Sequence, residues 1–246
     1  MPNDVIAMIP ARIGSTRLKM KNLALIDGMP LVYYAISAAK NAKVFKRIIL
    51  NADAGVFEDI ASRYGIELYL RPPSLGGSEI KSDAVVADFM ESHSCDAVAW
   101  INPIAPFQTG SQISQMIKKF FAEKLDTLHT VKREQVHAAF QGTPINFSED
   151  EIFARTQDLK PVEIFAYSLM MWRSTSFLEA WRTDGRAFFV GKVGYFDVGK
   201  MAALLIKTRD DLLLADSIMR GKSSVNRTPG AVDVQYDQVV RGLSLE

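Results

Sequence analysis

The stretch that decides the fold is V-I-A-M-I-P-A-R-I-G-S-T-R-L-K-M-K-N, which runs from Val5 to Asn22. Its apolar start ends at Pro10, as in a short buried strand. A small-residue turn follows (Gly14, Ser15, Thr16) and carries four cations (Arg12, Arg17, Lys19, Lys21). Backbone N–H groups and cations in such a turn can hold a polyphosphate. The stretch therefore predicts a nucleotide site at the carboxyl end of the first strand; a merely solvated polar turn is the alternative.

Strand and helix patterns alternate over the first half of the chain. Strands are expected at Val5–Ile9, Arg47–Asn51, Glu67–Leu70, Ala97–Ile101 and Asp126–Val131. Helices are expected at Pro30–Asn41, Val56–Tyr64, Ser82–Ser92 and Gly110–Glu123. This alternation predicts a mainly parallel sheet with helices on both faces, a three-layer α/β/α fold.

The regular alternation of strand and helix patterns ends after Lys132. The segment from Glu134 to Pro161 has few periodic runs, which indicates a hairpin or irregular insertion. Further strands are expected at Ile164–Trp172, Phe188–Val193 and Ala202–Ile206, and helices at Phe177–Trp181 and Asp210–Arg220. Thr208 is the expected N-cap of the last helix, and the polar tail after Gly221 is expected to be loosely held.

Bulk properties narrow the class of protein. The chain has 246 residues and a formal charge of +1, which suits a single globular domain and argues against a dedicated nucleic-acid binder. Its single cysteine, Cys95, excludes a disulfide framework. The start lacks signal-peptide character and no stretch has the length of a membrane span, so a cytoplasmic protein is expected.

The opening turn, I-P-A-R-I-G-S-T-R-L-K-M-K-N-L, and the following I-D-G-M-P-L-V-Y-Y-A-I resemble the cytidylyltransferases that activate sialic acids and related nonulosonic acids as CMP-sugars. Arg71-Pro72, Ser82 and Asn102–Thr109 extend the resemblance. It implies a Rossmann-like single domain over residues 1–246 that converts CTP and an acidic sugar to CMP-sugar and pyrophosphate with Mg²⁺. It also implies a homodimer formed through a small extension within about Glu134–Trp172.

The resemblance also assigns site residues. Arg12 and Lys21 would bind the triphosphate and stabilise the charge that develops on it, as catalytic residues. The implied nucleotide-binding set is Ala11, Arg12, Gly14, Ser15, Lys21, Asn22, Arg71 and Ser82. Asn22 could instead cap its turn, and Ser82 could be a helix N-cap. The implied sugar-side set is Asn102, Gln108, Phe188 and Phe189, although two phenylalanines in an apolar run are often core residues.

The chain departs from the family pattern near its C-terminus. Leu205 and Lys207 stand where the family carries two metal-binding aspartates, and neither can ligate a hard cation. Asp53 and, less directly, Asp197 are the remaining candidate carboxylates. Three explanations stay open: a rebuilt metal site, Lys207 supplying the charge, or a catalytically impaired homologue that binds nucleotide or sugar.

Overall fold

The computed structural model describes residues 3–15, 17–77 and 79–224. Its strands are β1 (Val5–Ala11), β2 (Leu25–Ile26), β3 (Met29–Pro30), β4 (Arg47–Ala52), β5 (Glu67–Leu70), β6 (Ala97–Ile101), β7 (Thr127–Glu134), β8 (Ala139–Phe140), β9 (Thr143–Pro144), β10 (Val162–Arg173) and β11 (Val193–Asp197). Its α-helices are α1 (Leu31–Ala42), α2 (Glu58–Tyr64), α3 (Ser82–Ser92), α4 (Gly110–Ala122), α5 (Ser174–Asp184), α6 (Gly199–Ala202) and α7 (Arg209–Ser224). Short 3₁₀ helices are η1 (Lys21–Leu23), η2 (Gly55–Phe57), η3 (Pro73–Leu75) and η4 (Thr156–Asp158).

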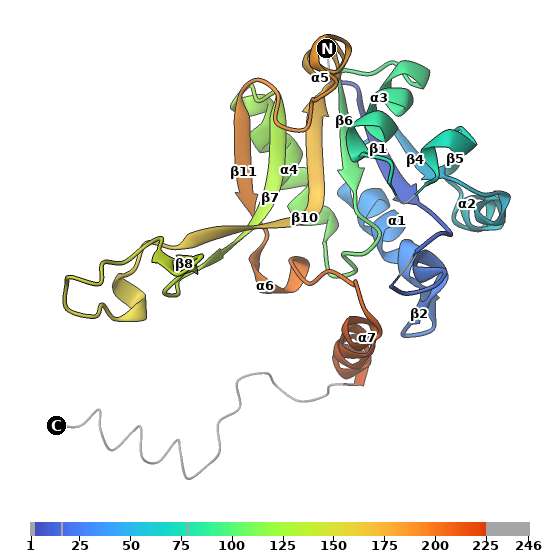
Figure 1. The fold of residues 1–246 in the computed structure, drawn as a ribbon. Helices are drawn as coiled ribbons and strands as arrows, with labels where there is room; N and C mark the ends of the chain where they lie inside the picture. The colour runs from blue at the N-terminus through green and yellow to red at the C-terminus, as the bar shows by residue number, and fades with distance from the viewer. Residues whose placement is uncertain (1–2, 16, 78, 225–246) are drawn as a thin grey trace.

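The centre of the molecule is a seven-stranded sheet in the order β11-β7-β10-β6-β1-β4-β5 (Figure 1). Strand β1 pairs in parallel with β4 on one side and with β6 on the other. Strand β10 is antiparallel to both β6 and β7, so the sheet is mixed at that point. The chain leaves β1 for β4 and later returns to β6, which makes the β1–β6 boundary the switch point where such sheets bind ligands.

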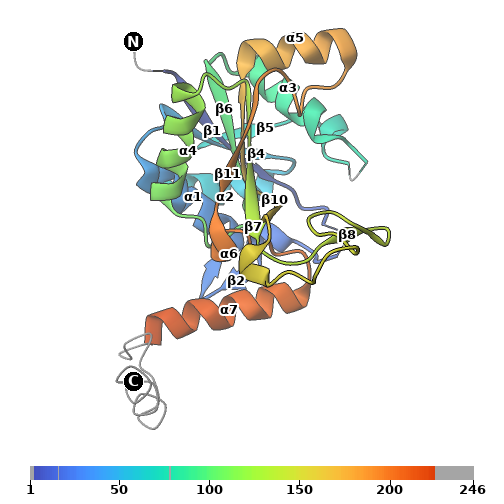
Figure 2. The same ribbon diagram turned by 90° about the vertical axis from the view of Figure 1, so that its left-hand side faces the viewer.

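Strand β1 is buried on both faces. Ala7 and Ile9 belong to the core that α1, α2 and α4 cover, whereas Ile6 and Met8 belong to the core under α3 and α5. Figure 2 shows these two helix layers on opposite sides of the sheet. Each fully buried side chain of this kind stabilises the fold by about 1.5–3 kcal/mol. The predicted three-layer α/β/α fold is confirmed.

The start of α4 is fixed by its own sequence. Thr109 and Gln112 form a capping box, in which the N–H of Gln112 donates to Thr109 Oγ1 at 3.2 Å and the N–H of Thr109 donates to Gln112 Oε1 at 3.1 Å. The next residue, Gly110, lies against the end of α1, where a Cβ would come within 2.6 Å of the backbone of Asn41 and Ala42. Only glycine permits this approach of the two helices.

Residues 135–161 project from the sheet as an arm between β7 and β10 (Figure 1). Asn146 organises it, because its Nδ2 donates to the carbonyl oxygens of Val136 and Lys160, each at 2.8 Å. Large apolar side chains are exposed along it: Phe140 (67%), Ile145 (60%), Ile152 (96%) and Phe153 (74%). The arm thus presents an unusual amount of apolar surface.

Two predicted strands near the C-terminus are wrong. Phe188–Lys192 is a turn, because its backbone groups bond to side chains: the N–H of Phe188 donates to Asp83 Oδ1 (3.1 Å), and Phe188 O accepts from Trp172 Nε1 (3.1 Å). The strand β11 begins afterwards, at Val193.

The segment predicted as the strand Ala202–Ile206 ends the short helix α6 and continues as an irregular link. Ile206 turns inward to a small apolar cluster, which explains the misleading hydrophobic run. The predicted cap of α7 is confirmed, since Thr208 Oγ1 accepts from the N–H of Asp211 at 3.2 Å. The tail expected to be loosely held lies, beyond Ser224, outside the described residues. None of the helices in the described ranges has the length and apolarity needed to cross a membrane.

Candidate functional site

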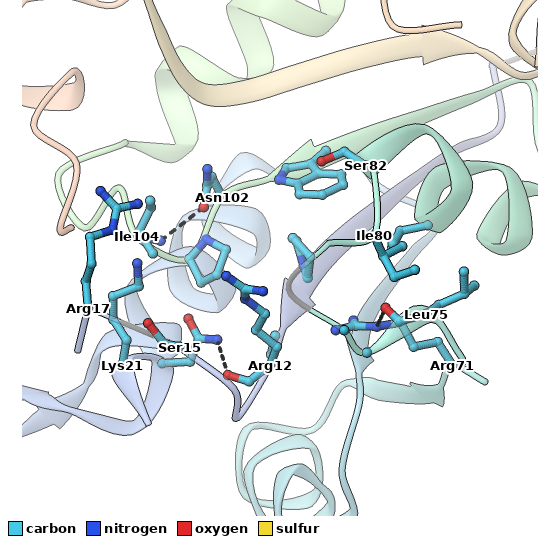
Figure 3. A pocket seen from close by; sticks show the side chains of 18 residues that line it. Arg12, Ser15, Arg17, Lys21, Arg71, Leu75, Ile80, Ser82, Asn102 and Ile104 are labelled. Carbon is cyan, nitrogen blue, oxygen red and sulfur yellow. Dashed lines mark hydrogen bonds between the residues drawn. The ribbon is translucent and has the colours of Figure 1, made fainter. Parts of the chain in front are cut away.

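A cavity of about 320 Å³ lies at the carboxyl ends of β1 and β6, and we call it the β1–β6 cavity (Figure 3). Eight residues proposed from the sequence line it: Ala11, Arg12, Ser15, Lys21, Asn22, Arg71, Ser82 and Asn102. The structure therefore brings together residues from the ends of two strands and the start of α3. Figure 3 shows Arg12 and Lys21 extending from the loop below, with Ser82 and Asn102 above.

The loop after β1 is braced from both sides. Asn22, which is 5% exposed, donates from Nδ2 to the carbonyl oxygen of Arg12 at 3.1 Å. The N–H of Ile13 donates to Asp53 Oδ1 at 3.0 Å. A Cβ added at Gly14 would meet nothing within 4 Å, so the loop is open above this residue. Asn22 thus holds the turn closed, the second of the two roles expected for it.

Positive charge is concentrated at the loop. Burial lowers the pKa of Lys21, and the neighbouring Arg17 and Arg12 lower it further. The Asp211 carboxylate acts in the opposite direction, and Lys207 adds to the lowering. Cations that depress one another in this way are stabilised when an anion binds among them. The loop is therefore an electrostatic site for a group such as a phosphate chain.

Arg71 is mainly a structural residue. It is 6% exposed, and its guanidinium donates to the carbonyl oxygens of Asn51 (2.7 Å) and Leu75 (3.2 Å). Its NH2 also lies 3.8 Å from Asp53 Oδ2, the carboxylate that supports the loop after β1. Burial lowers the pKa of Arg71, and Asp53 partly offsets this effect. Arg71 thus fixes the side of the cavity where it lies beside Leu75 in Figure 3.

The opposite wall combines polar and aromatic side chains. Ser82 is the first residue of α3 and lines the cavity, whereas the N-cap position is Lys81. Asn102 locks the turn after β6, since its Nδ2 donates to Tyr167 O (3.1 Å) and its Oδ1 accepts from the N–H of Ile104 (3.3 Å). The sequence analysis missed Trp100, whose buried Nε1 has no hydrogen-bond partner among the described residues. Its place inside an apolar strand gave no signal of this role.

The other sugar-side residues lie elsewhere. Phe188 and Phe189 line a second cavity of about 1010 Å³ between α3 and α5, the α3–α5 cavity, which shares Ile80 with the first. Phe188 packs on Trp172 in the core, while Phe189 is 56% exposed. Gln108 is 6% exposed, and its side-chain oxygen and nitrogen have no partners within the described part of the chain.

The residues present do not fit a carboxylate-held Mg²⁺. Asp53 is engaged by the N–H of Ile13 and by Arg71, and Asp197 Oδ1 accepts from the N–H of Gly199 at 2.9 Å. Over residues 3–15, 17–77 and 79–224, no group of three or more His, Cys, Asp and Glu side chains is placed to hold a metal ion. The described residues therefore provide no preformed cluster of carboxylates for Mg²⁺.

Leu205 and Lys207 line a third cavity, of about 290 Å³, together with Lys132, Phe165 and Asp211. We call it the β10–α7 cavity. The Asp211 carboxylate accepts from the N–H groups of Lys207 (2.8 Å) and Thr208 (2.7 Å). Burial alone would raise the pKa of Asp211, but these two bonds, the Thr208 side chain and the Lys207 charge together outweigh it, and the pKa lies below its ordinary value. Asp211 thus stabilises the backbone at the start of α7 by accepting these hydrogen bonds.

Comparison with known proteins agrees with this geometry. A family model described as cytidylyltransferase matches residues 6–162. The N-acylneuraminate cytidylyltransferase of Escherichia coli is 24% identical over 238 residues, covering 91% of this chain and 54% of that protein. The pseudaminic acid cytidylyltransferase of Campylobacter jejuni is 27% identical over 186 residues, covering 71% of this chain and 80% of that protein.

The chain spans about half the length of the N-acylneuraminate cytidylyltransferases that it matches. Its fold resembles that of a CMP:2-keto-3-deoxy-manno-octonic acid synthetase complexed with CTP, with a TM-score of 0.67 and 15% identity over 89% of this chain and 99% of that one. At this identity the likeness concerns the fold. Because the family model covers well over half of the sequence, this chain belongs to the cytidylyltransferase family.

Proposed function

We propose that this chain transfers CMP from CTP to an acidic sugar of the nonulosonic type and releases pyrophosphate. Its membership of the cytidylyltransferase family supports the reaction. Two relatives named for N-acylneuraminate and pseudaminic acid support the sugar class. In the family pattern that Asn102–Thr109 resembles, a serine and an arginine stand where this chain has Ala105 and Gln108, and this difference favours an acidic sugar other than sialic acid itself.

The single observation that carries the proposal is the braced, cation-bearing loop at the β1–β6 switch point. The sugar hydroxyl attacks the α-phosphorus of CTP and loses its proton to solvent, the bond from that phosphorus to the bridging oxygen breaks, and pyrophosphate leaves with that electron pair. Arg12 and Lys21 neutralise the charge that gathers on the phosphate oxygens, and preorganised cations of this kind lower the barrier by several kcal/mol. Asn22 and Asp53 hold the loop in place for this task.

The opposite wall of the cavity suits the base and the acceptor. The Ser82 hydroxyl can hydrogen-bond to the edge of cytosine, and Trp100 offers an aromatic surface beside it. Asn102 positions the turn on which the acceptor would rest. Phe188 and Phe189 would contact the apolar substituents of the sugar from the α3–α5 cavity, which shares the lining residue Ile80 with the β1–β6 cavity.

A second candidate is a catalytically impaired homologue that binds a nucleotide or a sugar. The observation that favours it is the unsuitability of Asp53 and Asp197 as metal ligands, together with Leu205 and Lys207 at the positions of the family aspartates. Such a protein would keep the phosphate loop and lose turnover.

Pyrophosphate release tests both candidates. Each of the four NTPs is assayed with a panel of nonulosonic and 3-deoxy-ulosonic acids, with Mg²⁺ and with EDTA. CTP-dependent and sugar-dependent release that Lys21→Ala abolishes supports the enzyme. Lys19→Ala is the matched control, because Lys19 is exposed in the same loop and does not line the cavity. CTP binding without release under every condition supports the impaired homologue. No binding of any nucleotide overturns the enzyme, and no binding of nucleotide or sugar overturns both.

We also propose that the chain forms a homodimer through the arm. The exposed side chains of Phe140, Ile145, Ile152 and Phe153 support this proposal, since their burial against a second copy would remove a large apolar surface from water.

A further inference from the structure

The link before α7, which carries Lys207, is tied to the wall of the β1–β6 cavity. The N–H of Ile206 donates to the carbonyl oxygen of Ile104 at 2.8 Å, and Ile104 lines that cavity. The Ile206 side chain is fully buried in an apolar cluster against which Leu18, from the cation-bearing loop, also packs. The link and the loop after β1 are therefore fixed relative to each other.

The neighbours of Ile206 lie at the protein surface instead. Leu205 and Lys207 both line the β10–α7 cavity, and Lys207 is exposed. The nearby carboxylate, Asp211, is bonded to the N–H groups of Lys207 and Thr208. The Lys207 ammonium is thus held at the edge of the phosphate loop by its backbone, while its side chain remains accessible to a ligand.

The charged side chains of the link before α7 and of the loop after β1 influence one another. Lys207 is among the cations that lower the pKa of Lys21, after Arg17 and Arg12, and Asp211 offsets them only in part. A surplus of positive charge attracts an anion and repels Mg²⁺. Two described carboxylates of this region, Asp53 and Asp211, already accept hydrogen bonds from backbone N–H groups, which lessens their power to counter this repulsion.

We propose that this site holds the phosphate chain of its nucleotide without a carboxylate-bound divalent cation, and that the Lys207 ammonium supplies the positive charge on the α7 side of the cavity. The inference rests on the proposed function and deepens it, by assigning Lys207 to the binding of the phosphates. Inorganic tripolyphosphate carries the same chemistry without the base, so it reports on the phosphate site alone.

Calorimetry with tripolyphosphate and with CTP tests the proposal, each in EDTA and in Mg²⁺. Both ligands are expected to bind in EDTA. Lys207→Ala is expected to weaken that binding about tenfold, as the loss of one charge-assisted contact does. Lys118→Ala is the matched control, because Lys118 is an exposed lysine on α4 outside all three cavities, and it should leave the affinity unchanged.

Three results would overturn the inference: a requirement for Mg²⁺, an unchanged affinity in Lys207→Ala, or no binding of tripolyphosphate under either condition. Lys207→Asp provides a second readout, since it should abolish binding in EDTA and make the remaining binding dependent on Mg²⁺. Thermal unfolding of each variant should match that of the wild type, because Lys207 is exposed. Tripolyphosphate binding through Lys207 without pyrophosphate release from any NTP would sustain this inference while the proposed function fails.

Discussion

Asn22 Nδ2 donates a 3.1 Å hydrogen bond to the carbonyl oxygen of Arg12, and this bond joins the two ends of the cation-bearing loop. Asn22 is one of the few polar side chains that the protein buries almost completely. Its bond keeps the backbone of Arg12 in place while the guanidinium faces the cavity. The shape of the phosphate loop thus depends on Asn22, a cavity-lining residue whose side-chain amide is engaged by the backbone of the loop itself.

Asn22→Ala should lower both stability and CTP affinity. The variant leaves the Arg12 carbonyl without its partner, which should reduce the free energy of unfolding by about 1–3 kcal/mol. The loosened loop should bind CTP about tenfold more weakly, because the ligand must then order it. Urea unfolding and calorimetry measure the two effects. Asn41→Ala is the control, since Asn41 is exposed on α1, and an equal loss of affinity in that variant would contradict the role of Asn22.

Gly110→Ala should destabilise the protein without touching the cavity. The new Cβ would lie 2.6 Å from the Ala42 nitrogen and the Asn41 carbonyl carbon, so α4 and α1 must move apart. Overpacking of this kind reduces the free energy of unfolding by about 1–3 kcal/mol. Gly14→Ala has open space around its Cβ and should change the stability by less than about 0.5 kcal/mol. Equal unfolding midpoints for the two variants would refute the close approach.

Stability should fall in mild acid because of His129. This residue is fully buried, its Nε2–H donates to Phe188 O at 2.9 Å, and its Nδ1 is buried with no partner among the described residues. Burial lowers the pKa of His129, so the folded protein keeps it neutral while the unfolded chain takes up a proton below about pH 6.5. The contribution is fully present above that pH and is lost as the pH falls through it.

The expected loss is up to about 1.4 kcal/mol per pH unit below that point. Urea unfolding of wild type and His129→Gln between about pH 8 and about pH 5 measures it. The two proteins share every other ionisable group, so the difference between the two slopes isolates His129. Parallel slopes would show that His129 does not stay neutral in the fold.

Ile152→Glu should weaken the homodimer and spare the monomer. The Ile152 side chain is 96% exposed, so a charge there costs the fold little, whereas a buried unpaired charge in an interface costs several kcal/mol. Light scattering at several protein concentrations should show a shift to the monomer. Leu213→Glu, at a 55% exposed position on α7, is the control and should leave the dimer intact. A monomeric wild type, or an unaffected Ile152→Glu, would argue against association through the arm.

Local sequence signals predicted the layered fold well. The apolar run from Val5 to Ile9 and the helix expected from Gly110 are each encoded by local patterns, so both appear where expected. The prediction of a strand ending at Ile206 was wrong. The apolar residues of this irregular link pack against a hydrophobic cluster, and their sequence pattern resembles that of a strand. Strand propensity cannot distinguish a buried strand from an irregular apolar link when the contact that decides between them involves residues distant in the sequence.

The candidate site likewise combines features that local sequence predicts with features that depend on distant contacts. The cation-bearing loop is contiguous, and its residues could be named from the sequence. That Lys207 lies near this loop depends on the bond between Ile206 and Ile104, and the place of Trp100 in the cavity wall depends on where β6 lies in the sheet. Spacing along the chain carries no information about either relationship.

The register shift within β10 is a seam, by which we mean a position where the strand can be joined to a different segment in protein engineering. Phe165 pairs with Val131 and Met170 with His129, so β10 carries extra residues between these points, and the left-handed Tyr167 lies among them. A strand without such a break would transmit a one-residue insertion as an inversion of every side chain beyond it. Here the seam can absorb length changes, so arms taken from relatives can be exchanged at this point while the half of β10 beside β6 keeps its register.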